Sequence, residues 1–275
     1  MFARLLVGLD GSPGADAALD VALSLGHRFQ TTILLAAVTD IRLLEAPLLE
    51  STGSLWADGV PAAPVAVELR QAMDERAARI LDAASAKVAE AGLASEPVRA
   101  TGIVVDELLR LADVADALVL GRRGELHAAP GTLGAVTTRL IKRATKPVLV
   151  AGERPSACER PVVAYDGGET STHALELAAR YAEALKRPLA VVHVADDAAG
   201  DALLARAAAF LSGLNVTFQT HRLSGDVAPA VAAFVAAYGA DLLVAGAHGG
   251  RHSWTLGSHA ERLLKVTAIP VIIHR

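Results

Sequence analysis

Short apolar runs alternate with longer amphipathic segments along the first half of the chain. The apolar runs have the length of buried strands, and the segments between them repeat apolar residues every three or four positions, as helices with one buried face do. The longest of these segments, 65–91, carries such a stripe and is followed by Gly92, a residue typical of helix ends. The pattern predicts strands over 2–9, 31–38, 96–101, 117–120 and 147–150, and helices over 14–28, 65–91, 105–114 and 135–144.

The same landmarks recur in the same order in the second half of the chain. The Asp-Gly turn that follows the first strand, at Asp10, has a counterpart at Asp166, and the Ala-Asp-Ala-Leu-Val-Leu-Gly run at 115–121 has one at 240–246. Repetition in order indicates a duplicated domain, whose second copy is shorter between its second and fourth strands. The sequence therefore predicts a first domain over 1–152, a linker over 153–160 and a second domain over 161–275.

Strands that alternate with helices favour the α/β class. We expect two tandem five-stranded, mostly parallel open sheets with helices on both faces, a Rossmann-like arrangement, because parallel strands need helical crossovers. In such sheets ligands bind beyond the carboxyl ends of the strands, where the strand order reverses. Asp10, Val38 and Gly121 are all expected at carboxyl ends. A binding site is therefore predicted at that edge of the first sheet.

A glycine-rich loop follows the strand at 117–120. It contains Gly121 and Gly124, and after nine further residues Gly134 opens a predicted helix. Glycine permits close approach of backbone to a ligand, and the first turn of a helix offers unpaired N–H groups and a positive dipole end to an anion. The second copy has a shorter version, in which seven residues separate Gly249 from Gly257. The loop predicts a phosphate-binding site.

Composition narrows the possible functions. The 26 Lys and Arg residues against 30 Asp and Glu give a formal net charge of -4, which offers no general attraction to nucleic acid or to an acidic membrane surface. No apolar run approaches the roughly 18 residues of a membrane-spanning helix. The single cysteine, Cys158, excludes an intramolecular disulfide and is expected to be an exposed thiol in the linker. A cytoplasmic protein with neither nucleic acid nor membrane as a partner is expected.

Taken together, the early strand ending in Asp-Gly-Ser, the spaced glycines and the final Pro-Val-Leu-Val strand resemble the universal stress protein family, here as a tandem member. The resemblance implies the fold of adenine-nucleotide alpha hydrolases and a stress-response or signalling module that binds ATP, ADP or AMP, with Mg²⁺ as a companion of ATP. It implies adenine contacts at the first two strands and phosphate and ribose contacts in the glycine loop. In the first domain these positions are Asp10, Val38, Gly121, Arg123, Gly124, Gly134, Ala135, Val136 and Thr137; the weaker set in the second domain is Asp166, Gly246, Gly249, Gly257 and Ser258.

Two departures from the family pattern bear on affinity. Ala135 stands where the motif has Ser or Thr, and a hydrogen bond to a charged group is worth roughly 1.5–3 kcal/mol, or about 10- to 100-fold in affinity. A hydroxyl from Thr137 or Thr138 would compensate, as would the charge of Arg123. The second copy keeps the hydroxyl at Ser258, but its shorter loop favours at most a smaller anion. The first domain is therefore expected to be the main nucleotide site.

Other interpretations of these residues stay open. The glycines would also serve a simple strand-to-helix turn, and Asp10 would also cap the following helix. His248 and His252 are spaced like zinc ligands but fall in a predicted loop without cysteine, so no metal site is expected. No lysine follows the glycines as in a P-loop, and no carboxylate pair has a recognisable catalytic spacing. No catalytic residues are predicted and the chain is not expected to be an enzyme, although slow ATP hydrolysis stays open.

The rival function is a nucleotide-free interaction module. It would act through the edge strands of the sheets and through the irregular apolar segment 39–63. That segment has three interpretations: a flap over the nucleotide, a surface for an unknown protein partner, or a segment folded onto its own domain. By resemblance the fifth strand is an exposed edge that pairs with a second copy. We therefore expect 148–150 and 271–273 to pair within this chain as a pseudo-dimer, and a homodimer stays open.

Overall fold

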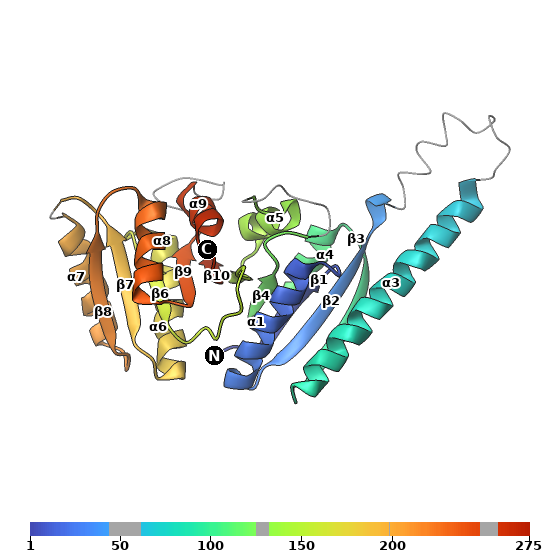
Figure 1. The fold of residues 1–275 in the computed structure, drawn as a ribbon, viewed down its shortest axis with the longest axis horizontal. Helices are drawn as coiled ribbons and strands as arrows, with labels where there is room; N and C mark the ends of the chain where they lie inside the picture. Colours follow the sequence, from blue (N-terminus) through green and yellow to red (C-terminus); the bar gives the residue numbers. More distant parts are fainter. Residues whose placement is uncertain (44–61, 125–131, 198, 248–257) are drawn as a thin grey trace.

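The protein is an α/β structure built on one ten-stranded sheet (Figure 1). A computed structural model describes residues 1–43, 62–124, 132–197, 199–247 and 258–275. The strand order is β3-β2-β1-β4-β5-β10-β9-β6-β7-β8. The strands are β1 (Arg4–Leu9), β2 (Thr32–Asp40), β3 (Ser95–Gly102), β4 (Ala117–Leu120), β5 (Val148–Val150), β6 (Pro161–Ala164), β7 (Leu189–Val194), β8 (Phe218–Leu223), β9 (Leu242–Gly246) and β10 (Val271–His274).

Helices cover both faces of the sheet, as the apolar stripes predict. One buried cluster lies under α1, α3, α6 and α7, and the other lies under α4, α5, α8 and α9. None of the described helices is long and apolar enough to cross a membrane. Their bounds are α1 (Pro13–Phe29), α3 (Ala62–Glu90), α4 (Val104–Ala112), α5 (Ala135–Arg143), α6 (Glu169–Leu185), α7 (Ala199–Ser212), α8 (Val227–Tyr238) and α9 (Ser258–Val266).

The two halves of the chain have the same topology. Within each half all neighbouring strands are parallel, and the first strand of the half lies between the second and the fourth. The strand order therefore reverses between β1 and β4 in the first half and between β6 and β9 in the second. The predicted duplication is confirmed by this arrangement, and each half has the point at which ligands bind in such sheets.

The halves meet where β5 pairs with β10. The pairing is antiparallel and sets Val150 opposite Val271 and Val148 opposite Ile273. The expected pairing of the two fifth strands is thus confirmed. This ladder joins the two expected five-stranded sheets into one ten-stranded sheet.

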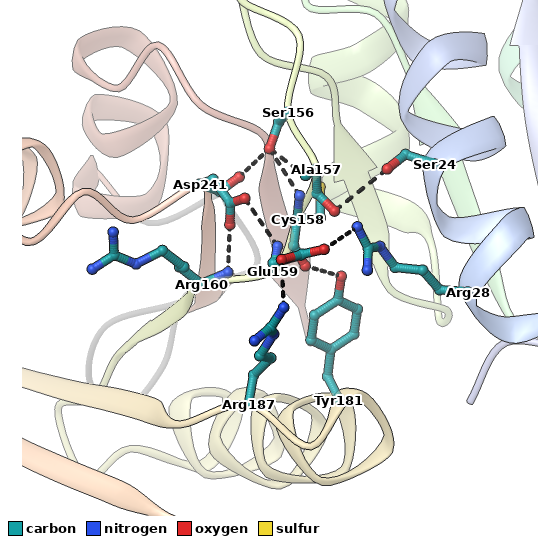
Figure 2. Close-up of polar contacts among 10 residues, drawn as sticks. All are labelled: Ser24, Arg28, Ser156, Ala157, Cys158, Glu159, Arg160, Tyr181, Arg187 and Asp241. Carbon is teal, nitrogen blue, oxygen red and sulfur yellow. Dashed lines mark hydrogen bonds and ion pairs between the residues drawn. The ribbon is translucent and has the colours of Figure 1, made fainter.

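The connection from β5 to β6 is mostly exposed over residues 153–160, but Cys158 and Glu159 contact both halves. Cys158 is fully buried, with a positive φ of 54°, and its backbone N–H donates to Ser156 Oγ at 3.1 Å. The carboxylate of Asp241 accepts from the backbone N–H groups of Glu159 and Arg160 (Figure 2). Because Cys158 is buried, the prediction of an exposed thiol is wrong. The same burial raises the pKa of the thiol to about 12. Composition misled because these polar groups are satisfied by tertiary hydrogen bonds.

Side chains from both halves converge on this connection. Glu159 forms ion pairs with Arg28 of α1 and with Arg187, which follows α6 (Figure 2). These two pairs hold the pKa of the Glu159 carboxyl below its usual range, and the Arg28 hydrogen bond is the largest cause. The Tyr181 hydroxyl of α6 donates to the Cys158 carbonyl at 2.7 Å, and its ring packs against Phe29 of α1 at 5.6 Å between centroids. The connection therefore fixes one half against the other.

The long helix α3 flanks the first half beside β2 and β3 (Figure 1). Its predicted apolar stripe is buried in the second part of the helix, at Ala77, Ala84 and Val88. The equivalent helix of the second half, α7, is shorter, as predicted. Most of the apolar segment 39–63 lies outside the described residues, so its three interpretations stay open. Residues 39 and 40 belong to β2, which runs two residues beyond the predicted end at Val38.

Candidate functional site

A cavity of about 490 Å³ opens at the carboxyl edge of the first half, between β1 and β4. It lies where the strand order reverses, at the position predicted for a ligand. Every residue predicted for the site in the first domain lines it: Asp10, Val38, Gly121, Arg123, Gly124, Gly134, Ala135, Val136 and Thr137. The structure thus brings together residues from two strand ends, one loop and one helix start.

The turn from β1 into α1 is fixed by two short-range hydrogen bonds. Asp10 Oδ1 accepts from the backbone N–H of Ser12 at 2.9 Å, and Ser12 Oγ accepts from the N–H of Ala15 at 3.2 Å. Ser12 is therefore the N-cap of α1, with Pro13 after it at the first helical position. The alternative that Asp10 caps this helix is wrong. Its carboxylate holds the turn and lines the cavity.

The glycine loop packs tightly on the start of α1. A Cβ atom built at Gly121 would lie 2.5 Å from the Gly14 carbonyl carbon, and one at Gly14 would lie 2.2 Å from the Arg123 carbonyl oxygen. Both glycines are therefore required by packing alone. A Cβ at Gly124 would lie 2.5 Å from Asp10 Oδ2, so the loop backbone approaches the carboxylate directly.

Gly134 is a different case, because the fold does not require a glycine there. Its φ of -62° suits any residue, and among the described residues a Cβ added at this position would have its nearest neighbours 3.4 Å away. It is the N-cap of α5 and makes no side-chain cap, so no side chain of its own occupies the approach to the first turn of the helix. Ala135 is exposed in that turn. The helix end is thus open to an anion at the place where the sequence predicted one.

Thr137 cannot readily replace the hydroxyl missing at Ala135. It is buried, and its Oγ1 donates to the Gly121 carbonyl at 2.8 Å, which ties α5 to the end of β4. The proton of this hydroxyl is therefore engaged, and a contact of Thr137 with a phosphate stays a prediction. Thr138 is half-buried one residue further along α5.

The cavity wall has an apolar part and a basic part. Small and apolar side chains of β2 and α3, including Ala37, Val38 and Ile80, form the first. Four arginines line the second, and the sequence predicted one of them, Arg123. The others are Arg42, Arg76 and Arg139. The helical spacing of Arg76 and Ile80 on α3 was a usable signal, because these two residues share one face.

Two of these arginines have partners within the wall. Arg42 forms a two-point ion pair with Asp40, with Nε 2.9 Å from Oδ1, and this hydrogen bond holds the Asp40 carboxyl pKa below its usual range. Arg76 donates to the Asp10 carbonyl at 2.8 Å and so links α3 to the β1 turn. Thr39 also lines the cavity, and its hydroxyl has no hydrogen-bond partner within the described part of the chain.

The second half has a cavity of about 270 Å³ at the equivalent position. Of the residues predicted there, Asp166 and Gly246 line it, Gly249 and Gly257 lie outside the described residues, and Ser258 begins α9. Larger side chains narrow this cavity, because Ala164, Val192 and His193 stand where the first half has Gly8, Ala36 and Ala37. Neither Lys nor Arg is found among its described lining residues.

Two described histidines of the second half, His193 and His221, make backbone and packing contacts. The His193 ring lies with Nδ1 2.8 Å from the Tyr165 carbonyl, and His221 packs against Phe234 with 4.7 Å between ring centroids. Burial lowers the pKa of His274. His248 and His252 lie outside the described residues, and among those that are described no group of three or more His, Cys, Asp or Glu could hold a metal ion.

Comparison with known proteins shows that both halves of the chain match the same family. A model of the Universal stress protein family matches residues 1–152 and 200–275. The chain is 29% identical over 290 residues to Universal stress protein Slr1230 of Synechocystis sp., with 99% of each chain covered. It is 30% identical over 152 residues to Universal stress protein YxiE of Bacillus subtilis, which covers 54% of this chain and 99% of that one.

Solved structures share the fold along the whole chain. The crystal structure of a universal stress protein from Archaeoglobus fulgidus superimposes with a TM-score of 0.77 at 20% identity, over 99% of this chain and 96% of the other. A Pseudomonas aeruginosa protein described as functionally unknown, PA1789, superimposes with a TM-score of 0.62 at 13% identity, over 99% and 92%. The tandem arrangement therefore occurs in other proteins of the same fold.

Proposed function

We propose that this chain, which belongs to the universal stress protein family as a tandem member, binds an adenine nucleotide in the cavity of its first half. ATP is the form that the family resemblance favours, and the role is that of a nucleotide-dependent stress-response or signalling module. Family membership also favours a cytoplasmic setting.

The observation that carries the proposal is the convergence of nine residues, chosen from sequence alone, on one cavity at the reversal of strand order. The volume of about 490 Å³ lies within the roughly 300–1,000 Å³ typical of small-molecule sites. The apolar wall of β2 and α3 suits a flat base, and the open start of α5 with Arg123 and Arg139 suits phosphates. The residues present therefore fit the ligand.

Gly134 supports the proposal more sharply than the other glycines. Packing explains Gly14 and Gly121, whereas at Gly134 neither the φ nor any contact among the described residues requires a glycine. A ligand that approaches the first turn of α5 closely would account for a residue without a side chain at this point.

Binding without fast turnover is the form we favour. Asp40 of the described cavity wall is ion-paired with Arg42, and Asp10 holds the β1 turn through its Oδ1. A general base must lie within hydrogen-bond reach of the attacking water, and no carboxylate pair in the sequence has a recognisable catalytic spacing. Any Mg²⁺ would on this proposal be held chiefly by the phosphates of ATP.

The test begins with the purified chain, which is denatured and analysed for released ATP, ADP or AMP. Calorimetry with added ATP should then give one site per chain. Gly124→Asp should remove binding, because the new carboxylate meets Asp10, whereas Gly213→Asp at an exposed helix end should not. If the denatured protein releases no nucleotide, and if the chain does not bind ATP at millimolar concentration, the result would favour the nucleotide-free interaction module. Sustained ATP turnover that Gly124→Asp abolishes would favour an enzyme.

A further inference from the structure

Arg122 extends in two directions from the glycine loop. Its backbone belongs to the loop of the first cavity, where its carbonyl accepts from the N–H of Gly134 at 2.8 Å, directly before α5. Its side chain points the other way, is 9% exposed, and crosses to the second half of the chain. Arg122 therefore contacts the first half through its backbone and the second half through its side chain.

The guanidinium is held by three backbone carbonyls. Nε donates to Ala151 at 3.0 Å, Nη2 donates to Ile269 at 2.9 Å, and Nη1 donates to Leu264. Leu264 lies in the last turn of α9, whose carbonyls have no partner within the helix. A cation at the C-terminal end of a helix is also favoured by the helix dipole. Burial lowers the pKa of Arg122, and Glu153 opposes that shift.

The surrounding contact is close enough to transmit a displacement. Glu153 donates its backbone N–H to Ala268 at 2.8 Å, and a Cβ on Gly152 would lie 2.5 Å from the same carbonyl oxygen. Well-packed groups of this kind shift together rather than deform separately. A displacement of the Arg122 guanidinium would therefore displace residues 264–269 as well.

The helix α9, whose Leu264 carbonyl accepts from Arg122, also contributes to the wall of the second cavity. Leu263, the residue before the Arg122 acceptor, lines that cavity together with Ala260 of the same helix. In the second half Ala247 stands at the position of Arg122, so this position cannot make the same contact. The reverse contact, to the Lys142 carbonyl of α5, comes from Arg275 near the end of the chain.

We propose that Arg122 couples ligand binding in the first cavity to the position of α9, and thereby to the second cavity. The inference rests on the proposed nucleotide site. A ligand on the loop and on the start of α5 fixes the Arg122 backbone, and the guanidinium carries that constraint to the carbonyls of α9. Coupling is reciprocal, so an undocked α9 also weakens nucleotide binding in the first half.

Hydrogen exchange of the full-length chain, with and without saturating ATP, tests the coupling. In the wild-type chain ATP should slow exchange in peptides that cover α9 and 267–270. In Arg122→Ala the ATP affinity should fall roughly fivefold or more, a typical coupling factor, and saturating ATP should no longer slow exchange in α9. Arg122→Lys keeps a cation but cannot span three carbonyls, so it should show the same changes in weaker form and serves if Arg122→Ala does not fold.

Arg275→Ala is the matched control. It also removes an arginine hydrogen bond between the halves, from Arg275 to the Lys142 carbonyl of α5 at 2.7 Å, but lies outside the glycine loop. It should leave the slowing of exchange in α9 intact. ATP binding by the wild-type chain without any change in α9, or equal slowing in the Arg122 variants, would overturn the coupling alone. A wild-type chain that binds no ATP would overturn the proposed function and the coupling with it.

Discussion

The two cavities of this chain occupy the same place in the same topology and differ in what lines them. The first measures about 490 Å³ and has four arginines in its wall, whereas the second measures about 270 Å³ and has neither Arg nor Lys among its described lining residues. The strand order, the Asp-Gly turn and the glycine after the fourth strand are kept in both. The fold therefore supplies the location, and a few side chains decide what fits there.

The narrowing of the second cavity has a simple cause. The floor of the first cavity uses Gly8, Ala36 and Ala37, which leave space above the sheet, and the equivalent positions of the second half hold larger side chains. Because these positions lie in regular strands, the change fills the pocket without altering the fold.

Charge reversal in the first cavity should have the largest effect. Arg123→Glu replaces a cation in the wall by an anion, and loss of a charge-assisted contact together with added repulsion should weaken ATP binding about 100-fold. Calorimetry measures this, with the exposed Arg206→Glu of α7 as the control for net charge. Equal losses in both variants would contradict a local role for Arg123.

Restoring the missing hydroxyl should strengthen the contrast between the halves. Ala135→Ser places a donor in the exposed first turn of α5, and ATP should bind at least about tenfold more tightly. The dissociation constant measured by calorimetry gives the answer. An unchanged constant would mean that the phosphates do not reach this turn.

Adding a methyl group at the start of α5 should weaken ATP binding, whereas the added hydroxyl should strengthen it. Gly134→Ala should weaken ATP binding roughly fivefold to tenfold by obstructing the approach, yet leave the free energy of unfolding within about 1 kcal/mol, because no strained φ or close contact is involved. Denaturant unfolding and calorimetry separate the two effects. Gly213→Ala, at an exposed glycine that also has room for a Cβ, should change neither.

Widening the second cavity should have the smallest effect on ATP. The double variant Val192→Ala and His193→Ala reproduces the small floor of the first cavity but adds no cation. We expect the number of ATP molecules bound per chain to stay at one. A second bound ATP would show that volume, and not charge, separates the two halves.

Sequence predicted most of the framework and most of the first site. The elements and the duplication followed from local periodicity and repeated landmarks, which are readable without tertiary contacts, and the pairing of β5 with β10 followed from the family resemblance. Arg122 and Cys158 could not be placed in this way. Arg122 sits in a phosphate-loop motif but acts at carbonyls contributed by Leu264 and Ile269, far along the chain, and Cys158 is buried because Ser156, Tyr181 and Asp241 satisfy its polar surroundings.

The local chemistry of the site was also refined by structure. Ser12, not Asp10, caps α1, and the Thr137 hydroxyl serves the Gly121 carbonyl. At the first place Asp10 and Ser12 were both candidates for the helix cap, and at the second Thr137 and Thr138 were both candidates for the phosphate hydroxyl. The backbone geometry decides which contact each side chain makes. Sequence narrows such roles to a pair, because either residue type is compatible with the pattern.

The β5–β10 ladder has a consequence for how the protein responds to its own abundance. When two separate chains pair through this strand, the fraction that is paired rises and falls with protein concentration. Here residues 151–160 connect the two partners, so the second partner is always present at the high effective concentration of a short tether. On the proposed coupling, communication between the halves would then depend on the ligand and not on pairing with a second chain. Such a chain would give the same output per molecule whether the cell holds few copies or many.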